Sequence, residues 1–422
     1  MLIIKNGHII DTVAGIEADL DVMIDDGSIV RVDADIDTAQ ADEVIDAAGC
    51  VVAPGLMDAH VHFRDPGFTH KEDIFTGAAA AKRGGFTTVI CMANTKPAAD
   101  NPDTLKYILD KGEKTGIHVM SCATVTKGMK GSELVDMELL KKCGAAGFTD
   151  DGLPIMDERV VLSAFKKAKE LDMCISLHEE DPLFIEAPGV NMGHVSEKLG
   201  YGGASHTAED VMVARDCALA LHTGARVLIQ HISSEASVEI VRAFKKLGAD
   251  VHAEATPHHF SLTEEAVLTS GTNARMNPPV RTEKDRQAII SGLIDGTIDM
   301  IVTDHAPHAA DEKDRPMAEA PSGIIGLETS LGLGIMKLVA PGHLSMMELM
   351  KKMSLNPAVF YGIKPWTVAE GNAADIVIFD PVRQWKVTDF ASKSSNSPFV
   401  GWELPGQVKY TICGGTVVYA AD

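Results

Sequence analysis

Val51–His62 reads VVAPGLMDAHVH, a short apolar run that closes on two histidines one residue apart, His60 and His62. Side chains on a strand point alternately to its two faces, so the two imidazoles are expected on the same side. Two imidazoles that project together from the end of a buried strand make half of a metal site. Because so short a motif also occurs by chance, its meaning depends on the rest of the chain.

Eight apolar, β-rich runs follow one another between residues 51 and about 305, and stretches with helical periodicity separate them. The runs are Leu56–His62, Phe86–Met92, Ile117–Ala123, Ala145–Thr149, Met173–His178, Arg226–His231, Asp250–Ala255 and Ile298–Asp304. Strand and helix alternating eight times predict an α/β fold of the (β/α)₈ TIM-barrel type. A doubly wound open sheet is the alternative, and the count of eight together with the position of the polar residues favours the barrel.

The two ends of the chain follow another pattern, in which apolar and polar residues alternate. Asp26-Gly27 and Gly414-Gly415 each separate two such runs and are typical of tight hairpins. Neither end is long enough to form a stable sheet alone. We therefore expect one small β-sandwich built from residues 1–53 and 364–422, beside a catalytic barrel of residues 54–363. The polar stretch Ala391–Pro398 is expected to be a solvated loop.

Composition excludes several classes of function. The 422 residues carry a formal net charge of −22, which argues against a nucleic-acid partner, and an anionic substrate would need cations of its own in the pocket. The apolar runs are too short to span a membrane, and the N-terminus lacks the pattern of a secretory signal. A cytoplasmic protein is expected. Its seven cysteines include no Cys-x-x-Cys pair, which indicates reduced thiols.

Polar residues stand where the predicted strands end, at the face that carries the active site in such barrels. They are His60 and His62, Asn94, Asp150 and Asp151, His178, His231, and Asp304. Each alone has an ordinary explanation, such as a turn at Asp150-Asp151-Gly152. Together, four histidines and two aspartates suit zinc, and two ions better than one, because a two-metal site makes a bridging hydroxide at neutral pH.

The six candidate ligands are expected to divide between the two ions. His60 and His62 would hold one zinc ion together with Asp304, and His178 and His231 would hold the other. Asp151 is the candidate for the residue that bridges the two ions.

Five segments resemble motifs of known enzymes. Pro54–His62 resembles the opening motif of the cyclic amidohydrolases, within the amidohydrolase superfamily. With the further segments, which are His62–Gly67, Phe148–Gly152, Met276–Pro279 and Asp304–His308, the chain resembles the class I bacterial dihydroorotases from end to end. The resemblance implies a zinc-dependent enzyme that reversibly cyclises N-carbamoyl-L-aspartate to L-dihydroorotate in de novo pyrimidine (UMP) biosynthesis.

Thr149-Asp150-Asp151-Gly152 is the most discriminating segment. In hydantoinases, dihydropyrimidinases and allantoinases a carboxylated lysine bridges the metals, whereas this chain has no lysine there. The resemblance implies that Asp151 takes that role, and the neighbouring Asp150 is the alternative. Two other functions stay open on the sequence alone. They are a related cyclic amidohydrolase of hydantoinase, dihydropyrimidinase or allantoinase type, and an inactive dihydroorotase-like scaffold.

The resemblance also implies roles around the substrate. Asp304 would move the proton during catalysis. The residues expected to bind substrate are Arg64, Asn94, Asn277 and His308, with His62 close by and Ser322 and Gly323 contributing backbone groups. A fork from Arg64 to a substrate carboxylate is also physically reasonable. For partners, the family implies a homodimer and a possible association with aspartate transcarbamoylase.

Overall fold

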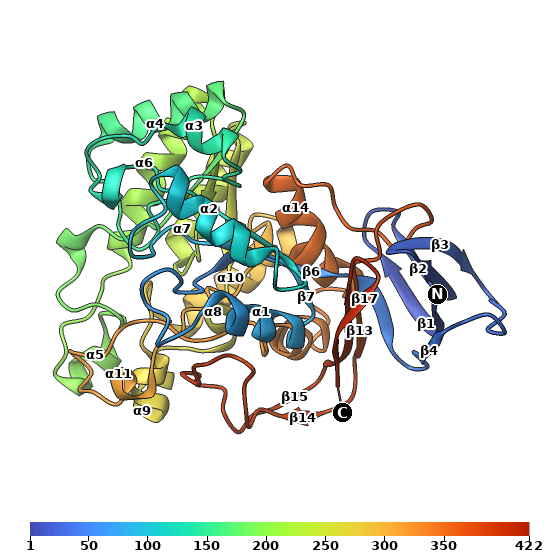
Figure 1. The fold of residues 1–422 in the computed structure, drawn as a ribbon. Coiled ribbons are helices and arrows are strands. Elements are labelled where there is room, and N and C mark those ends of the chain that lie inside the picture. Colours follow the sequence, from blue (N-terminus) through green and yellow to red (C-terminus); the bar gives the residue numbers. More distant parts are fainter. Residues whose placement is uncertain (422) are drawn as a thin grey trace.

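The computed structural model describes residues 1–421, and its barrel is built from parallel strands that follow one another around a ring (Figure 1). The barrel strands are β6 (Leu56–Val61), β7 (Phe86–Cys91), β8 (His118–Ser121), β9 (Cys174–Leu177), β10 (Arg226–Ile229), β11 (Val251–Ala255) and β12 (Met300–Ile301). They form two parallel sheets, β6-β7-β8 and β9-β10-β11-β12. The predicted barrel, rather than the doubly wound sheet, is the observed fold.

Two short contacts close the ring. Phe148 forms single parallel bridges to Ala123 on one side and Ile175 on the other. The rest of the predicted strand at residues 145–149 adds only separate backbone hydrogen bonds, such as those from the Ala146 and Thr149 N–H groups to the carbonyls of Ser121 and Ala123, both at 2.9 Å. Alanine and glycine before Phe148 have low strand propensity, which explains the short pairing. On the other side of the barrel, Val61 bridges His305, and the His62 N–H donates to the His305 carbonyl at 2.8 Å.

The interior of the barrel is a separate apolar cluster that includes Met57 and Ala59 of β6. Strict alternation would then point His60 and His62 outward. The pairing of β6 with β7 is irregular between Asp58 and Val61, where Asp58 pairs with Val89 and Val61 with Cys91. Between these two pairs β6 advances by three residues and β7 by two, so β6 holds one extra residue. Such a β-bulge reverses the alternation of side chains beyond it, and both histidines therefore point into the barrel.

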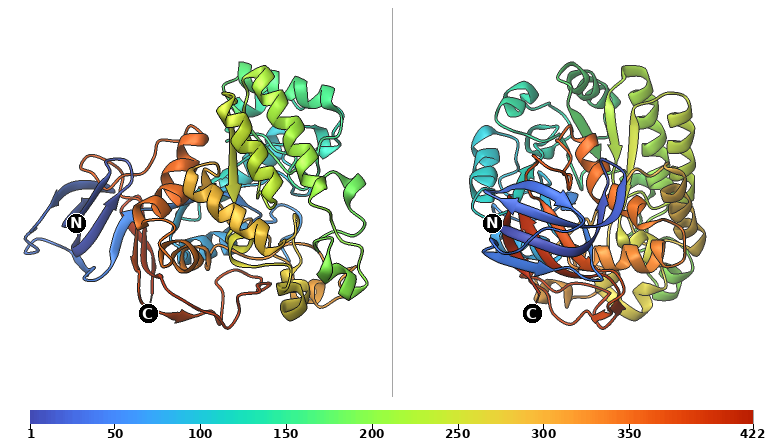
Figure 2. Two further views of the ribbon diagram at one scale, coloured as in Figure 1. Left: turned by 180° about the vertical axis from the view of Figure 1, so that it is seen from behind. Right: turned by 90° about the vertical axis from the view of Figure 1, so that its right-hand side faces the viewer.

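Helices surround the barrel, and their apolar faces share one large core with the outer faces of the strands. Figures 1 and 2 show this outer layer. The α-helices are α1 (Ile74–Arg83), α2 (Pro102–Gly112), α3 (Met137–Lys142), α4 (Glu158–Glu170), α5 (His194–Leu199), α6 (Thr207–Thr223), α7 (Glu235–Lys246), α8 (Pro257–Ser261), α9 (Ala266–Ser270), α10 (Glu283–Asp295), α11 (Ala310–Lys313), α12 (Ser330–Gly334), α13 (Met346–Met350) and α14 (Asn356–Phe360). Helix α1 begins at an Asp73 capping box, and α6 ends at Gly224 in the left-handed conformation.

Both ends of the chain combine in one further sheet. Within residues 1–421 it has eight strands, which are β1 (Leu2–Asp11), β2 (Ile16–Asp25), β3 (Ser28–Asp33), β4 (Glu43–Asp46), β5 (Val51–Pro54), β13 (Ile376–Asp380), β16 (Gln407–Cys413) and β17 (Thr416–Ala420). Neighbouring strands are hydrogen-bonded all the way from β17 to β3. Residues from the N-terminal and the C-terminal segments, such as Ile29 and Ile412, belong to one hydrophobic cluster. A two-stranded ribbon, β14 (Trp385–Lys386) with β15 (Glu403–Leu404), lies apart from it.

The terminal sheet meets the barrel where the barrel strands begin. β5 passes through Gly55 directly into β6, and the Gly55 N–H donates to the Asp375 carbonyl at 2.9 Å. Figure 2 shows the sheet at one side of the barrel, with both chain ends near it. The opposite side, where the strands end, is therefore left for the predicted site.

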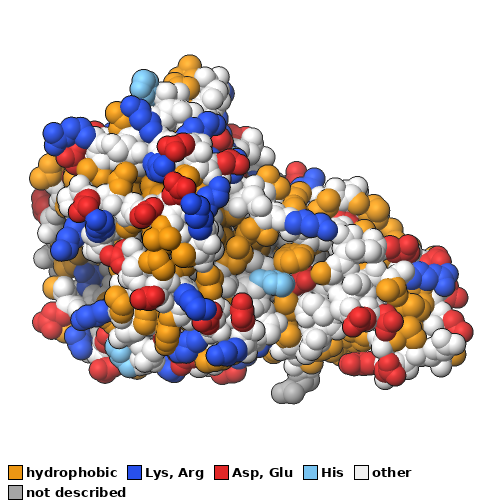
Figure 3. Space-filling model, turned by 45° about the horizontal axis from the view of Figure 1, so that its top comes forward, with side chains coloured by type: hydrophobic (Ala, Val, Ile, Leu, Met, Phe, Trp, Pro, Cys, Tyr) orange, Lys and Arg blue, Asp and Glu red, His pale blue; other side chains and the backbone are white. Residues whose placement is uncertain are grey.

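The surface carries charges of both signs. Over the face in Figure 3, acidic and basic side chains are interspersed rather than gathered in a basic stripe. Across residues 1–421, helices are too short or too polar to cross a membrane. The seven cysteines, all within that range, are free thiols.

Candidate active site

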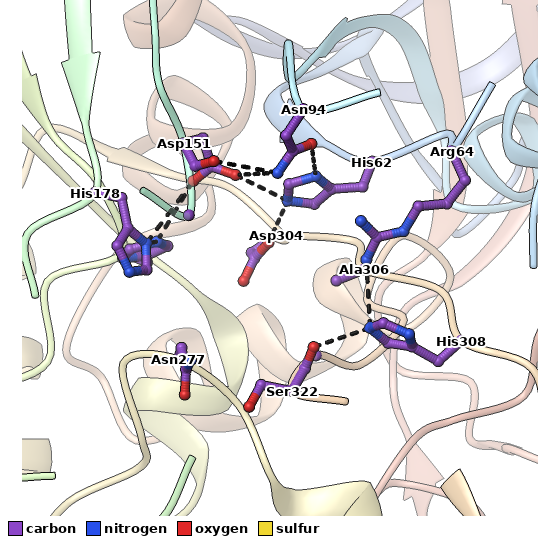
Figure 4. Close-up of a pocket in the computed structure, with 13 residues that line it drawn as sticks. His62, Arg64, Asn94, Asp151, His178, Asn277, Asp304, Ala306, His308 and Ser322 are labelled. Atoms are coloured by element: carbon purple, nitrogen blue, oxygen red, sulfur yellow. Dashed lines mark hydrogen bonds and ion pairs between the residues drawn. The ribbon is translucent and has the colours of Figure 1, made fainter. Parts of the chain in front are cut away.

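A cavity of about 190 Å³ opens where the barrel strands end, and it gathers most of the predicted site residues (Figure 4). Its lining includes His62, Arg64, Asn94, Asp151, His178, His231, Asn277, Asp304, His308, Ser322 and Gly323. His60 is fully buried behind this lining but reaches the same carboxylates. The volume is small for a ligand pocket and suits a compact molecule.

Asp151 is the common member of two groups of possible metal ligands. One group is His60, His62 and Asp151, and the other is Asp151, His178 and His231. Asp151 Oδ1 lies 3.4 Å from His60 Nε2 and 3.9 Å from both His178 Nδ1 and His231 Nε2. Its Oδ2 lies 3.4 Å from His62 Nε2. One carboxylate thus faces all four histidines.

The other ring nitrogens of His60 and His62 are held by acceptors. His60 Nδ1 lies 2.6 Å from Glu254 Oε1, and His62 Nδ1 lies 3.0 Å from the Asn94 side-chain oxygen. A carboxylate or amide oxygen can only accept, so each Nδ1 carries a proton, and each Nε2 is the ring nitrogen that faces the carboxylates of the cavity and is available to a metal ion. Among the described residues, His60 Nε2 finds no hydrogen-bond partner although it is buried. Such an orphaned donor atom fits a metal ligand.

In His178 it is Nε2 that is held by an acceptor and Nδ1 that faces the cluster. Its Nε2 lies 3.0 Å from Glu180 Oε2, which leaves the Nδ1 lone pair directed at Asp151 and, at 3.0 Å, at His231 Nε2. Two imidazole nitrogens that face each other at this distance need one proton or one cation between them. The donor set and the orphaned atoms therefore fit metal ions, and carboxylates behind the ligands are the usual way to orient them.

Electrostatics inside the cluster favour an ionised carboxylate. Burial alone would raise the pKa of Asp151, but His60, His62 and His178 outweigh it and hold that pKa far below its usual range. Burial, with help from His178 and His60, lowers the pKa of His231 well below its usual value. Asp151 is therefore charged and His231 is neutral, the forms in which both bind metal.

The two neighbouring aspartates point to different places. Asp150 Oδ1 accepts from the backbone N–H groups of Val125 and Thr126 at 2.8 and 3.1 Å, and its Oδ2 accepts from the Thr126 hydroxyl. Asp150 thus ties down a loop, whereas Asp151 enters the cavity. Of the two alternatives left open by the sequence, the structure places Asp151 among the histidines.

Asp304 projects into the middle of the cavity in Figure 4. Its Oδ1 lies 3.0 Å from His62 Nε2 and 3.5 Å from His60 Nε2. Its φ is +48°, and Arg64 and His231 also have positive φ, at +59° and +29°. Non-glycine residues rarely adopt this region, and such strain is typical of residues whose side chains must be aimed at a site.

The opposite end of the cavity carries cations and neutral donors. Arg64 Nε donates to the Pro307 carbonyl at 3.2 Å, and its Nη2 lies 3.4 Å from His308 Nε2. His308 Nε2 also lies 2.9 Å from the Ser322 carbonyl, and Lys71 Nζ lies 3.3 Å from His308 Nδ1. Burial together with Arg64, Lys71 and Lys313 holds the pKa of His308 far below its usual value, so this histidine is neutral. The local cations expected for an anionic substrate are present.

Asn94 and Gly323, which were also predicted to bind substrate, both line the cavity. Asn94 lines the cavity, but its amide is already engaged, since it accepts from His62 and donates to Asp151 Oδ2 at 3.0 Å. Asn94 therefore orients the cluster in this structure. Gly323 has φ +126°, and a Cβ there would lie 2.7 Å from the Ala306 Cβ. Only glycine fits this wall of the cavity.

The polar stretch near residues 391–398 is not the solvated loop expected from the sequence. Ser392, Ser394, Asn396 and Ser397 are buried. The Asn396 side-chain NH₂ donates to the carbonyls of Ala306 and Gly323 at 3.1 and 3.0 Å. Its side-chain oxygen accepts from the backbone N–H of His308. Serine and asparagine satisfy buried backbone groups here, so the segment supports the wall of the cavity.

Glu254 and Glu180 are the functional residues that the sequence reasoning missed. Glu254 lies in β11 and is completely buried, and burial raises its pKa while His60 opposes that shift. A charged residue within the buried run Val251–Ala255 was the available signal, because such a residue needs a partner. Glu180 follows His178 by two residues in a loop, a position without a comparable signal.

Replacing Glu254 by glutamine is expected to weaken metal binding without unfolding the protein. The amide can accept from His60 Nδ1 but lacks the charge that strengthens the imidazole as a ligand, so the affinity for zinc should fall about 10–100-fold. Competition against a coloured chelator measures the affinity. Glu264→Gln, at a buried glutamate that contacts Asn191, is the control, and equal zinc affinity in both variants would contradict the role of Glu254.

The comparisons with known proteins agree with this geometry. A model of the family described as Dihydro-orotase-like matches residues 49–237. The dihydroorotase of Clostridioides difficile (strain 630) is 58% identical over 421 residues, which cover 100% of both chains. That of Clostridium acetobutylicum is 55% identical and covers 99% of both. Curated dihydroorotases thus match the whole length of this chain, including both terminal segments.

Solved structures extend the likeness to the fold. An L-hydantoinase (dihydropyrimidinase) from Arthrobacter aurescens superposes with a TM-score of 0.86 at 25% identity, covering 99% of this chain and 96% of its own. A D-hydantoinase (dihydropyrimidinase) from Thermus sp. gives 0.85 at 24% identity, covering 100% and 96%. These more distant chains share the barrel with its terminal sheet, whereas the high identity is to dihydroorotases. This chain belongs to the dihydroorotase family.

Proposed function

We propose that this enzyme catalyses the reversible cyclisation of N-carbamoyl-L-aspartate to L-dihydroorotate. The observation that carries the proposal is the two-ended cavity, with a cluster of histidines and aspartates at one end and Arg64 with neutral donors at the other. The substrate has both an amide bond to be made or cleaved and a carboxylate to be held. The full-length identity to curated dihydroorotases supports the same assignment.

Two zinc ions are proposed as the cofactor. His60 and His62 with Asp304 would hold one, His178 and His231 the other, and Asp151 would bridge them, since it alone belongs to both groups of candidate ligands in the described chain. When bound, such ions lower the pKa of water and act as Lewis acids on a carbonyl oxygen. Nitrogen and carboxylate donors suit zinc, and cobalt or manganese could replace it.

Asp304 is proposed to move the proton. In the hydrolytic direction its carboxylate takes the proton from the attacking water and gives it to the ring nitrogen as the amide bond breaks. In the synthetic direction it removes a proton from the ureido nitrogen as that nitrogen attacks the carboxyl carbon, and it gives the proton to the carboxyl oxygen, which leaves as water when its bond to carbon breaks. Its central position supports the role, with His62 Nε2 at 3.0 Å to orient the carboxylate.

Arg64 is proposed to bind the substrate carboxylate through its guanidinium fork, with Asn277 and His308 beside it. Asn277 lines the cavity, and its side-chain oxygen is buried without a hydrogen-bond partner in residues 1–421. A substrate N–H would satisfy that oxygen. The backbone at Ser322 and Gly323 completes this end of the cavity.

Arg64→Lys is expected to raise KM about 10–100-fold with a smaller change in kcat, because lysine keeps the charge but loses the bidentate fork. Steady-state kinetics with L-dihydroorotate measure both constants. Arg159→Lys, at an arginine whose side chain is 90% exposed, is the control and should behave as wild type. An unchanged KM in the Arg64 variant would remove the residue from the substrate site.

Three wider predictions accompany the reaction. The family resemblance implies a homodimer and a possible complex with aspartate transcarbamoylase, and composition predicts a cytoplasmic protein. Sedimentation of the purified chain, alone and with the transcarbamoylase of the same organism, tests the first two. Fractionation of cells tests the third.

A further inference from the structure

A second cluster of possible metal ligands lies at the opposite end of the barrel from the cavity. It consists of His118, Asp375 and Cys413, which come from three elements. His118 is the first residue of β8, Asp375 immediately precedes β13, and Cys413 is the last residue of β16. The cluster therefore spans the junction between the barrel and the terminal sheet.

The Asp375 carboxylate is the centre of this cluster. Its Oδ1 lies 2.9 Å from His118 Nε2 and 3.1 Å from Cys413 Sγ. Its Oδ2 is buried and finds no hydrogen-bond partner in the described part of the chain, although the residue is only 1% exposed. Two partners are ordinary for Oδ1, but the buried Oδ2 without a partner leaves the carboxylate incompletely satisfied by the hydrogen bonds of the protein.

The other two side chains are arranged as ligands would be. The Trp366 ring stacks on the His118 ring with centroids 4.8 Å apart, which orients the imidazole. Cys413 is 8% exposed, and its sulfur faces the same Asp375 oxygen as His118 Nε2. His118 and Cys413 also line a cavity of about 560 Å³, so an open position of a metal ion would face water.

We propose that His118, Asp375 and Cys413 bind a divalent, tetrahedrally coordinated metal ion such as Zn²⁺, with water in the fourth position. One imidazole nitrogen, one carboxylate oxygen and one thiolate are zinc donors. The ion would tie β8 to the strands of the terminal sheet and is separate from the ions of the catalytic cavity.

The geometry needs a small expansion on binding. Ligand atoms of a tetrahedral zinc ion are about 3.4–3.6 Å apart, given the usual zinc–ligand distances, so the present contacts must open by about 0.5 Å. The His118 side chain is 42% exposed and has room to move. The metal–sulfur bond replaces the S–H bond, and the proton leaves to the water of the adjoining cavity.

Cobalt is the probe that separates this site from the catalytic one. The catalytic ligands proposed above are histidines and aspartates, so a near-ultraviolet thiolate-to-cobalt charge-transfer band would report on a cysteine site. Metal-depleted protein is titrated with Co²⁺, and absorbance, bound equivalents and turnover are recorded. Cys413→Ser and His118→Ala are the test variants. Cys50→Ser is the matched control, because Cys50 is as buried as Cys413 and immediately precedes β5, another strand of the terminal sheet.

The expected result is a charge-transfer band in wild type and in Cys50→Ser. Both test variants should lack the band and bind one equivalent of cobalt less, with turnover of L-dihydroorotate unchanged. A wild-type protein without the band would overturn the proposal, as would a band that persists in Cys413→Ser. Equal numbers of bound ions in all four proteins would also overturn it.

Discussion

Asp304→Asn is expected to retain its metal ions and to lose nearly all turnover. Asparagine keeps an oxygen at the position of Oδ1, 3.0 Å from His62 Nε2, but it cannot accept and return a proton. Proton transfer by a positioned side chain contributes up to about 10⁴-fold, so kcat should fall by about 10³-fold or more in both directions of the reaction. Steady-state kinetics and elemental analysis of the same sample measure turnover and metal content.

The matched control is Asp314→Asn, at an aspartate that follows α11 and is exposed. It should have wild-type kinetics. Normal turnover in Asp304→Asn would exclude the proton-transfer role. Loss of metal together with turnover would mean that the residue acts mainly as a ligand.

Asp151→Asn and Asp150→Asn are expected to fail in different ways, although the residues are neighbours. Asp151 faces four histidines, and its pKa is held far below the usual range, so the ionised form is the one the cluster selects. Neutral asparagine removes the negative charge shared by both ligand groups. Zinc affinity should fall by more than about 100-fold, since even partners behind the ligands contribute 10–100-fold, and turnover should be lost with the metal.

Asp150→Asn should instead keep zinc and lose stability. Asp150 accepts from the backbone N–H groups of Val125 and Thr126, and weakening such buried bonds costs about 1–3 kcal/mol in the free energy of unfolding. Denaturant unfolding and chelator competition on both variants separate the effects. Tight zinc binding in Asp151→Asn, or its loss in Asp150→Asn alone, would contradict the bridging role of Asp151.

Much of the fold can be predicted from local sequence patterns, namely apolar runs and the glycines that end helices. The strands that begin at Leu56, Phe86 and Arg226 start at the predicted residues, because long apolar runs and the glycines after helices mark them. The strand at residues 145–149 was predicted longer than it is, since Phe148 pairs at single bridges. The barrel geometry, not local propensity, keeps that stretch in the ring.

The site was predictable where the chemistry lies on the residue itself. Histidines and aspartates at strand ends converge because parallel strands end on one face. Side-chain orientations and contacts that depend on residues far apart in the sequence could not be predicted from local patterns. The bulge that turns His60 and His62 inward requires the pairing with β7, and the burial of Asn396 against Gly323 joins residues 73 positions apart. The placement of Glu254 behind His60 likewise depends on the closed barrel.

The most direct test of the account is turnover of purified, metal-depleted protein reconstituted with zinc, assayed on L-dihydroorotate, N-carbamoyl-L-aspartate and a hydantoin, with and without bicarbonate. Asp151 needs no carboxylation, unlike a bridging lysine, so the account predicts turnover of the first two compounds that bicarbonate does not change, with about two zinc ions at the catalytic cluster per chain. Turnover of the hydantoin alone, or no turnover of either pyrimidine precursor by the zinc-loaded protein, would contradict it.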